Sequence, residues 1–408
     1  MGPITLFDKS FLQGLSVDES VWFDHFFYPV IAPLFYVETL ADLRKAVKQG
    51  RTAEQGVAVI ASKTPQMSGG PVYFHRELCR GAMLGGQVPM DGRIPIAYGR
   101  TVHHKGKPAT YIEQTPEYVA FQRWQEGNFL QIEYQQAKQW RDYLATIDLT
   151  PLRGAIEANG GERCTDLAEA KRRAAAVVSV LHKSSGRFNT ALDILGIEQA
   201  DRDRVKARWK RAGSPQLHRF APYAAYVLTV ELFFHFAVAS HLIASTRPSH
   251  RIDIGYLHYL PFCQVFVSTD KLHKQCAPLL LRGEQSFVWG TGMKADLRSI
   301  NAHFASLDME ARTKGVVRFA NRLPDIDLPT IRPLFEKHTP SLLKPNESSP
   351  ASADIHSKIT AEVEAIRSAP AITEPFEPGD MDQLVIERMV SPVRGSWIVI
   401  PPDIAESS

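Results

Sequence analysis

The residues best placed to do chemistry are acids that stand close to short apolar runs. In the second half of the chain, the run Val265-Phe266-Val267 has the β-branched and aromatic character of a strand buried on both faces, and it ends in Ser268-Thr269-Asp270. In an open parallel sheet, ligands bind at the carboxyl ends of the strands, so Asp270 stands where chemistry is usually found. Asp253 lies on the helix-like stretch 252–262 before this strand, close enough for the chain to fold back and bring the two carboxylates together.

The N-terminal part of the chain offers a similar pattern. The apolar run 4–7 predicts a short strand, and Asp8 closes it. Glu38 interrupts the otherwise apolar, helix-forming stretch 35–43. The chain therefore carries an ordered set of carboxylates, two on helices between two that follow strands: Asp8, Glu38, Asp253 and Asp270.

Such a set points to metal chemistry. Carboxylates that are crowded together repel one another and raise one another's pKa, so they stay ionised only if cations lie among them. Oxygen ligands suit Mg²⁺ or Mn²⁺. Two such ions about 4 Å apart can activate a water molecule and stabilise the leaving oxygen when a phosphodiester bond is hydrolysed.

Each acid also has a structural interpretation. Asp8 and Asp270 stand directly before predicted helices, where Asp commonly caps the first turn. Asp42 follows Glu38 by one helical turn and is interpreted as a further ligand, as an outer partner of the site or as a solvated residue. The site is favoured over capping alone because the whole set fits one chemistry.

The order of these motifs resembles the PIN domain superfamily of metal-dependent ribonucleases. In that family the first strand ends in Asp, a helix carries Glu, a late helix carries Asp, and a further strand ends in Ser/Thr-x-Asp. The resemblance covers residues 1–45 and 225–300 and implies an α/β three-layer fold with a central parallel sheet. It also implies that four carboxylates bind the catalytic metal ions, namely those of Asp8, Glu38, Asp253 and Asp270. The hydroxyl groups of Ser268 and Thr269 would support them.

The long interval between Glu38 and Asp253 is interpreted as an insertion within the sheet domain. A PIN-like domain is predicted at 1–45 and 220–337, interrupted by a mainly helical insertion at 46–219. Residues 338–380 are rich in Pro, Ser, Ala and Glu and predict a loosely ordered linker. Within these parts the pattern predicts strands at 57–61, 383–388 and 396–400 and helices at 114–146, 165–184 and 199–213. The tail, 381–408, either docks onto the body or binds a partner.

The predicted helix at 199–213 is strongly basic. Arg204, Arg208 and Arg211 recur at the spacing of one helical stripe, and Trp209 lies beside them. Such a stripe suits a nucleic-acid backbone, with the indole stacking on a base. The alternative is a solvated helix face whose charges pair with nearby aspartates.

Composition excludes some classes of protein. The chain of 408 residues is long enough for two domains, and its hydrophobic content of 44% is enough to form their cores. Its formal charge of +3 does not by itself indicate nucleic-acid binding. Four cysteines without a CxxC pair, and a start without a basic and apolar leader, favour a cytoplasmic location over secretion. Glu231, His235 and His241 interrupt the apolar stretch 220–245, which therefore predicts a buried core helix and no membrane span.

The leading hypothesis is a divalent-metal-dependent nuclease of PIN type, with RNA favoured over DNA as substrate and with Mg²⁺ or Mn²⁺ as cofactor. The second hypothesis is a catalytically inactive relative that binds nucleic acid or serves in an assembly. A third, an α/β enzyme acting on a phosphorylated small molecule, is disfavoured because the glycines form neither a Walker loop nor a dinucleotide-binding motif. The resemblance also leaves open a regulatory protein partner.

Overall fold

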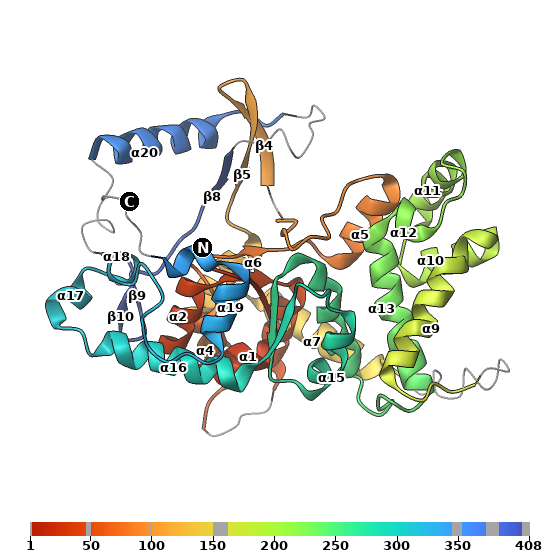
Figure 1. The fold of residues 1–408 in the computed structure, drawn as a ribbon, viewed down its shortest axis with the longest axis horizontal. Coiled ribbons are helices and arrows are strands. Elements are labelled where there is room, and N and C mark those ends of the chain that lie inside the picture. Colours follow the sequence, from red (N-terminus) through yellow and green to blue (C-terminus); the bar gives the residue numbers. More distant parts are fainter. Residues whose placement is uncertain are drawn as a thin grey trace.

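A parallel sheet lies at the centre of the computed structural model, which describes residues 2–45, 50–97, 99–149, 162–344, 353–372 and 383–401. The sheet, near the centre of the view in Figure 1, has five strands in the order β3-β2-β1-β6-β7, and its neighbouring strands are parallel. They are β1 (Ile4–Phe7), β2 (Tyr28–Ile31), β3 (Gly70–Pro71), β6 (Val265–Ser268) and β7 (Ser286–Trp289). The strands predicted at 4–7 and 265–267 are confirmed, and they are neighbours.

The two central strands send their side chains into two hydrophobic cores, because successive residues of a strand point to opposite faces. Leu6 and its register partner Phe266 enter one core, whereas Phe7 and its partner Val267 enter the other. All four side chains are fully buried. The sheet is therefore covered on both faces, which gives a mixed α/β fold with a parallel central sheet.

The core on the Phe7 face is formed by helices close in sequence to the strands. The second helix of the chain begins with a capping box, in which Ser16 caps the backbone of Glu19 and the Glu19 side chain accepts from the backbone of Ser16. Glu38 lies on a helix, as predicted. The helices of this core are α1 (Lys9–Gly14), α2 (Val17–Phe26), α3 (Pro33–Ala41), α4 (Ala53–Lys63), α6 (Pro116–Gln125), α16 (Gly290–Ala305), α18 (Val316–Phe319) and α19 (Ile331–His338).

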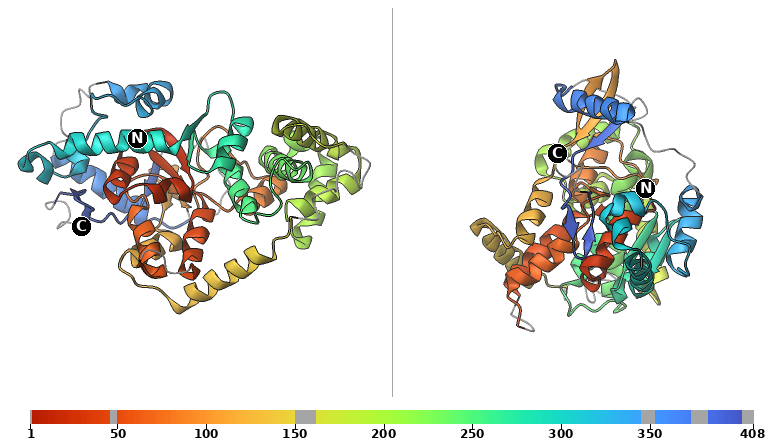
Figure 2. Two further views of the ribbon diagram at one scale, coloured as in Figure 1. Left: turned by 90° about the horizontal axis from the view of Figure 1, so that it is seen from below. Right: turned by 90° about the vertical axis from the view of Figure 1, so that its left-hand side faces the viewer.

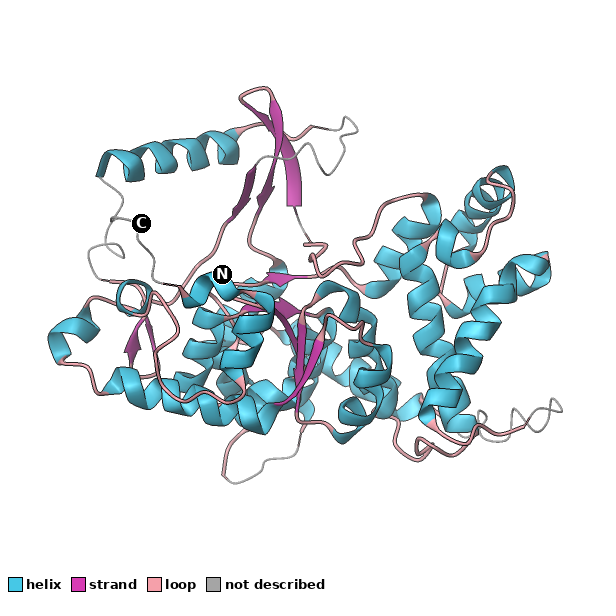
Figure 3. Ribbon diagram, viewed as in Figure 1, coloured by secondary structure: helices cyan, strands magenta, loops and turns pink. Residues whose placement is uncertain are grey.

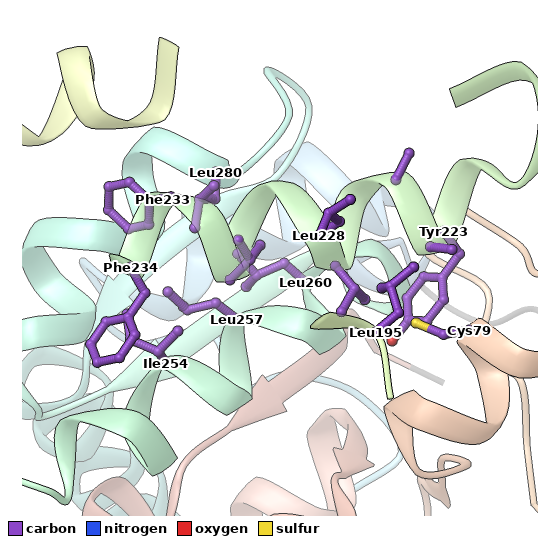
Figure 4. Packing of buried hydrophobic residues seen from close by; sticks show 14 of the residues in the cluster. Cys79, Leu195, Tyr223, Leu228, Phe233, Phe234, Ile254, Leu257, Leu260 and Leu280 are labelled. Atoms are coloured by element: carbon purple, nitrogen blue, oxygen red, sulfur yellow. The ribbon is translucent and has the colours of Figure 1, made fainter. Parts of the chain in front are cut away.

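The core on the Leu6 face extends into a lobe of helices. Its centre is α13 (Pro222–Ala239), whose Tyr223, Leu228 and Phe233 pack among side chains from several elements (Figure 4). The other elements of this core are α5 (His75–Leu84), α9 (Leu167–Val180), α10 (Ser185–Ile194), α11 (Gln199–Arg211), α12 (Leu217–Phe220), α14 (His250–Tyr256), α15 (Lys271–Leu280) and the 3₁₀ helices η3 (Leu181–Lys183) and η4 (Leu257–Phe262). Helix α7 (Gln131–Thr146) runs along the outside of the molecule, between the sheet and this lobe (Figure 2, left).

Helix α13 is long and apolar enough to cross a membrane, judged by length and composition alone. However, 67% of it is buried inside the protein, in the core on the Leu6 face. The prediction of a buried core helix is confirmed.

A second, smaller sheet projects from the body (Figure 3). Strands β4 (Gly99–His104) and β5 (Lys107–Ile112) form an antiparallel hairpin, and β8 (Gln383–Ile386) adds to β5 in parallel. Helix α20 (Ala353–Ser368) covers this sheet through Ile366, which is buried with Val102, Ala109 and Tyr111. The range 338–380, predicted to be a loosely ordered linker, thus contains a packed helix.

The C-terminal tail docks onto the body through a hairpin of β9 (Val393–Arg394) and β10 (Trp397–Ile398). Arg394 forms a buried ion pair of 2.6 Å with Asp24, and the Trp397 ring lies 4.8 Å from the Trp22 ring. Of the two interpretations of the tail, docking is the one observed for its described residues. The remaining short elements are η1 (Asp42–Arg44), α17 (Met309–Thr313) and η5 (Pro340–Leu343).

Three local predictions within 46–219 are wrong or incomplete. The strand predicted at 57–61 is part of α4, because Thr52 and Gln55 form a capping box and Val57, Ile60 and Ala61 recur at helical spacing. The helix predicted at 114–146 is divided into α6 and α7, since Gly127 adopts a φ of 77° that ends a helix. The range 46–219, predicted to be a mainly helical insertion within the sheet domain, also contributes strand β3 to the central sheet. The two residues of β3 are too few to show a strand pattern in the sequence.

Candidate acidic site

Asp8 stands at the carboxyl end of the central strand β1 and caps helix α1. Its Oδ1 accepts from the backbone N–H of Phe11 at 3.0 Å. Its Oδ2 accepts from the hydroxyl groups of Ser10 at 2.7 Å and Ser268 at 2.9 Å. The capping interpretation is correct for Asp8, yet the same carboxylate also joins the ends of two strands.

Asp270 follows the neighbouring strand β6 and caps helix α15. Its Oδ1 accepts from the backbone N–H groups of Leu272 and His273 at 2.7 and 3.3 Å. Because β1 and β6 are parallel, with Phe7 opposite Val267, Asp8 and Asp270 emerge at the same edge of the sheet. Ligands commonly bind at such an edge.

His273 ties these groups together, although nothing in the sequence assigned it to the site. Its side chain is fully buried. Its Nδ1 lies 2.9 Å from Ser268 Oγ and 3.3 Å from Asp8 Oδ2, and its Nε2 lies 2.7 Å from the carbonyl oxygen of Asp253. His273 therefore fixes helix α14, which carries Asp253, against the ends of β1 and β6. The only feature of the sequence that could have pointed to His273 is its position one helical turn after Asp270, the cap of the same helix.

The predicted hydroxyl groups have distinct partners. Ser268 Oγ donates to Asp8 and accepts from the backbone N–H of Asp270 at 2.9 Å. Thr269 Oγ1 donates to Ser10 Oγ at 2.8 Å, so it contacts Asp8 only through Ser10. Ser268 thus supports the acids directly and Thr269 indirectly.

Glu38 is held by residues that sequence reasoning also missed. Its Oε2 accepts from the hydroxyl of Tyr256, on helix α14, at 2.5 Å. Lys9 donates to the carbonyl oxygen of Glu38 at 2.9 Å and to the carboxylate of Asp42 at 3.0 Å. Asp42 is buried and also pairs with Lys45 at 2.8 Å, so it is an ion-paired neighbour of Glu38 and not a solvated residue.

The pKa values show that the acids interact electrostatically. The pKa of Asp253 is raised to about 7, first by burial and then by the charges of Asp270, Glu38 and Asp8, against the lowering effect of His273. Burial also raises the pKa of Glu38, and Asp8 and Asp42 add to the rise while Lys9 and Tyr256 oppose it. The structure therefore brings the predicted carboxylates, Asp8, Glu38, Asp253 and Asp270, into one electrostatic cluster.

Asp8 and His273 form the charged pair at the centre of this cluster. Burial would raise the pKa of Asp8, but the hydrogen bond and charge of His273 lower it below its usual value. Burial would lower the pKa of His273, but Asp8 and Asp253 raise it to about 9. His273 is therefore a cation at neutral pH, with an N–H directed to each side.

The donor chemistry of the cluster suits a hard divalent cation. Its side chains offer carboxylate oxygens, the ligands that Mg²⁺ and Mn²⁺ prefer. Burial raises the pKa of Asp253 most, and the repulsion by neighbouring carboxylates that adds to this rise is what a cation would relieve. Among the residues that the structure describes, however, no three or more His, Cys, Asp or Glu side chains are grouped so that they could hold one ion. The Oδ2 atom of Asp8 already has hydroxyl and imidazole partners, so ligation by that oxygen requires these side chains to rearrange.

The basic helix α11 differs from its prediction in two residues. Trp209 is 4% exposed, stacks on Phe188 at 4.1 Å and donates to the carbonyl of Pro215, so it is a core residue and is not available to stack a base. Arg208 lies over the Phe220 ring and donates to backbone carbonyls such as that of Met83. The side chains of Arg204 and Arg211 are exposed, so only these two of the predicted nucleic-acid contacts remain accessible.

Comparison of the chain with protein-family models, with curated proteins and with solved structures found no match. What the chain does must therefore be inferred from the site itself.

Proposed function

We propose that the chain is a divalent-metal-dependent nuclease with a PIN-like fold, acting on RNA in preference to DNA. The observation that carries the proposal is the convergence of separated acids at one edge of a parallel sheet, where burial and neighbouring carboxylates raise the pKa of Asp253 to about 7. The order of Asp after the first strand, Glu on a helix, Asp on a late helix and Ser-Thr-Asp after a further strand supports the PIN-like assignment.

Asp8, Glu38, Asp253 and Asp270 would hold one or two Mg²⁺ or Mn²⁺ ions. Such an ion, when bound, supplies a Lewis acid for the phosphoryl oxygens and a lowered pKa for water. Asp253 is about half protonated at neutral pH, so its carboxyl must release a proton to become a ligand. His273 orients Asp8, and Lys9 holds the backbone of Glu38.

The test is a cleavage assay on single-stranded RNA and DNA, with Mg²⁺, with Mn²⁺ and with EDTA. Cleavage should need the divalent ion, and Asp8→Asn or Asp270→Asn should lower the rate by roughly a hundredfold, because even outer partners of metal ligands commonly contribute 10- to 100-fold. Asp142→Asn is the matched control, since Asp142 is an exposed acid on α7 that pairs only locally with Lys138. The proposal fails if the protein cuts neither substrate, or if the site variants cut as fast as the control.

One observation favours a second function, a nucleic-acid-binding module without catalysis. Asp8 is engaged by Ser10, Ser268, Phe11 and His273, so an internal cation and hydroxyl groups already compensate its charge. Binding of an oligonucleotide without divalent-dependent turnover would favour this function over hydrolysis.

A further inference from the structure

A cavity of about 680 Å³ opens beside the acidic site, between helices α3, α5, α7 and α14. Aromatic and amide side chains line it, including Tyr36, Phe74, Trp140, Tyr143, Gln136 and Gln139. Its volume lies within the range of sites that bind small molecules, roughly 300 to 1,000 Å³. We refer to it as the α3–α14 cavity.

The side chains around the α3–α14 cavity include buried nitrogens that have no hydrogen-bond partner in the described chain. They are His75 Nδ1, His258 Nδ1 and Trp140 Nε1. His258 is completely buried, and its Nε2 lies 3.0 Å from Glu231, so its orientation is fixed from behind. Buried polar atoms almost always have a partner, but these nitrogens are closed to the cavity space, so a ligand would reach them only after the lining side chains shift.

The lining selects a chemical class. Planar aromatic rings stack on nucleobases, and glutamine amides offer both a donor and an acceptor to a base edge. Phe74 is 37% exposed and Tyr143 49% exposed, so rings remain accessible to a ligand. The guanidinium of Arg76 is exposed and supplies a positive charge for a phosphate.

The cavity and the acidic site share two helices. Val37 lines the cavity and precedes Glu38 on α3, while Ile252 lines it and precedes Asp253 on α14. The hydrogen bond from Tyr256 to Glu38 joins these helices. A nucleotide with its base in the cavity would therefore lie next to the carboxylates.

We propose that the α3–α14 cavity binds one unstacked base of a single-stranded nucleic acid, adjacent to the phosphodiester bond that is cut. This inference rests on the proposed function for the identity of the substrate. The strand must be single because a paired base reaches such a cavity only after unpairing and unstacking. The cavity thus sets a preference for single strands over duplexes.

The test measures binding without turnover. Fluorescence anisotropy of a labelled single-stranded RNA and a labelled single-stranded DNA is recorded in EDTA, with the full chain carrying Asp8→Asn. The double variant Gln136→Ala/Gln139→Ala and the variant Trp140→Leu should weaken binding by roughly fivefold to a hundredfold, the range expected when one stacked base is lost. Gln135→Ala is the matched control, because Gln135 is an exposed glutamine on the same helix that does not line the cavity.

Two unlabelled competitors distinguish binding of a single strand from binding of a duplex or of a free mononucleotide. An unlabelled duplex should compete at least tenfold less well than a single strand, and free mononucleotides should compete weakly. Equal binding by the cavity variants and the control, equal competition by the duplex, or tight binding of mononucleotides alone would each overturn the inference. The binding assay contains no divalent ion, so its result does not depend on hydrolysis. If the cleavage assay fails but binding still depends on the cavity, only the proposed nuclease activity is rejected and the base-binding cavity stands.

Discussion

Helix α14 and the 3₁₀ helix after it take part in two buried charge networks that differ in balance. In the Glu231 network, one carboxylate lies 2.8 Å from Arg251 and 3.0 Å from His258. In the acidic site, Asp8, Glu38, Asp253 and Asp270 share the nearby cations His273 and Lys9. Both networks pair a histidine with a buried acid, yet only the first has a cation for each carboxylate.

The pKa values follow from this difference. Burial would raise the pKa of Glu231, but Arg251 and His258 lower it well below its usual value. Burial and, to a smaller extent, its acidic neighbours raise the pKa of Asp253 to about 7. The Glu231 carboxylate is therefore charge-balanced within the protein, whereas the acidic site has unbalanced negative charge that an external cation would compensate.

The largest expected effect comes from removing one charge from each network. Glu231→Gln should lower the free energy of unfolding by about 3 kcal/mol, because it removes the carboxylate that pairs with the half-buried Arg251 guanidinium and contacts the buried His258 ring. Glu38→Gln should leave the unfolding free energy unchanged or raise it, because Glu38 is buried and repelled by other acids. Urea denaturation in EDTA measures both. Equal losses in the two variants would remove the contrast between the networks.

Adding the missing cation should stabilise only the acidic site. At pH 8, Mn²⁺ at a hundred times its Kd should raise the free energy of unfolding by about 2.7 kcal/mol. The increase should be much smaller in Asp253→Asn and intact in the exposed control Asp142→Asn. Thermal denaturation with and without Mn²⁺ checks this, and a full Mn²⁺ effect in Asp253→Asn would place the ion elsewhere.

The pH dependence of stability without metal should show the same imbalance. The pKa of Asp253 is about 7 in the folded chain and about 3.9 in the unfolded chain. Between these two pH values the folded state therefore binds more protons than the unfolded state. As a result, the free energy of unfolding falls as the pH rises from about 4 to 7. His273, whose pKa is raised to about 9, adds stability below about pH 6.5 that is lost as pH rises through 9.

Asp253→Asn should therefore be more stable than the wild type at pH 8, because the variant has no carboxylate to ionise at this position. The expected gain is only about 1 to 2 kcal/mol, since Asp253 is partly accessible to water and its interactions are screened. At pH 4 the two proteins should differ little, since Asp253 is protonated in the folded wild type. Denaturation in EDTA at both pH values measures this difference. A variant that is less stable than the wild type at pH 8 would contradict the assignment of the raised pKa to Asp253.

The smallest expected effect concerns the hydroxyl partners of Asp8. Ser10→Ala should lower the unfolding free energy by about 1 kcal/mol, the usual value of one hydrogen bond. It should also strengthen Mn²⁺ binding slightly, because one position on Oδ2 becomes free for a ligand. Unchanged or weaker Mn²⁺ affinity by calorimetry would favour the non-catalytic function, in which Asp8 serves only the protein.

Patterns local in the chain were sufficient to predict much of the fold. The strands at 4–7 and 265–267 are recognisable from short runs of apolar and β-branched residues, and Ser16 is recognisable as a cap from the glutamate three residues later. The helical pattern of α4 was misread because Val57, Ile60 and Ala61 also fit a short apolar strand. Trp209 was misassigned because a basic stripe gives no information about the helix face that the core covers.

By itself, the sequence determined where acids follow strands and helices begin, since strand alternation and capping depend on residues only a few positions apart. Only the tertiary structure decided that β1 pairs with β6 so that Ser268 meets Asp8, that His273 lies between them, and that β3 joins the sheet. It also decided that Glu231 is charge-balanced and that α3, α5, α7 and α14 enclose a cavity. These features depend on contacts between segments far apart in the chain. Burial, which no local pattern encodes, raises the pKa values of Asp253 and Glu38, whereas partners from distant segments lower those of Asp8 and Glu231.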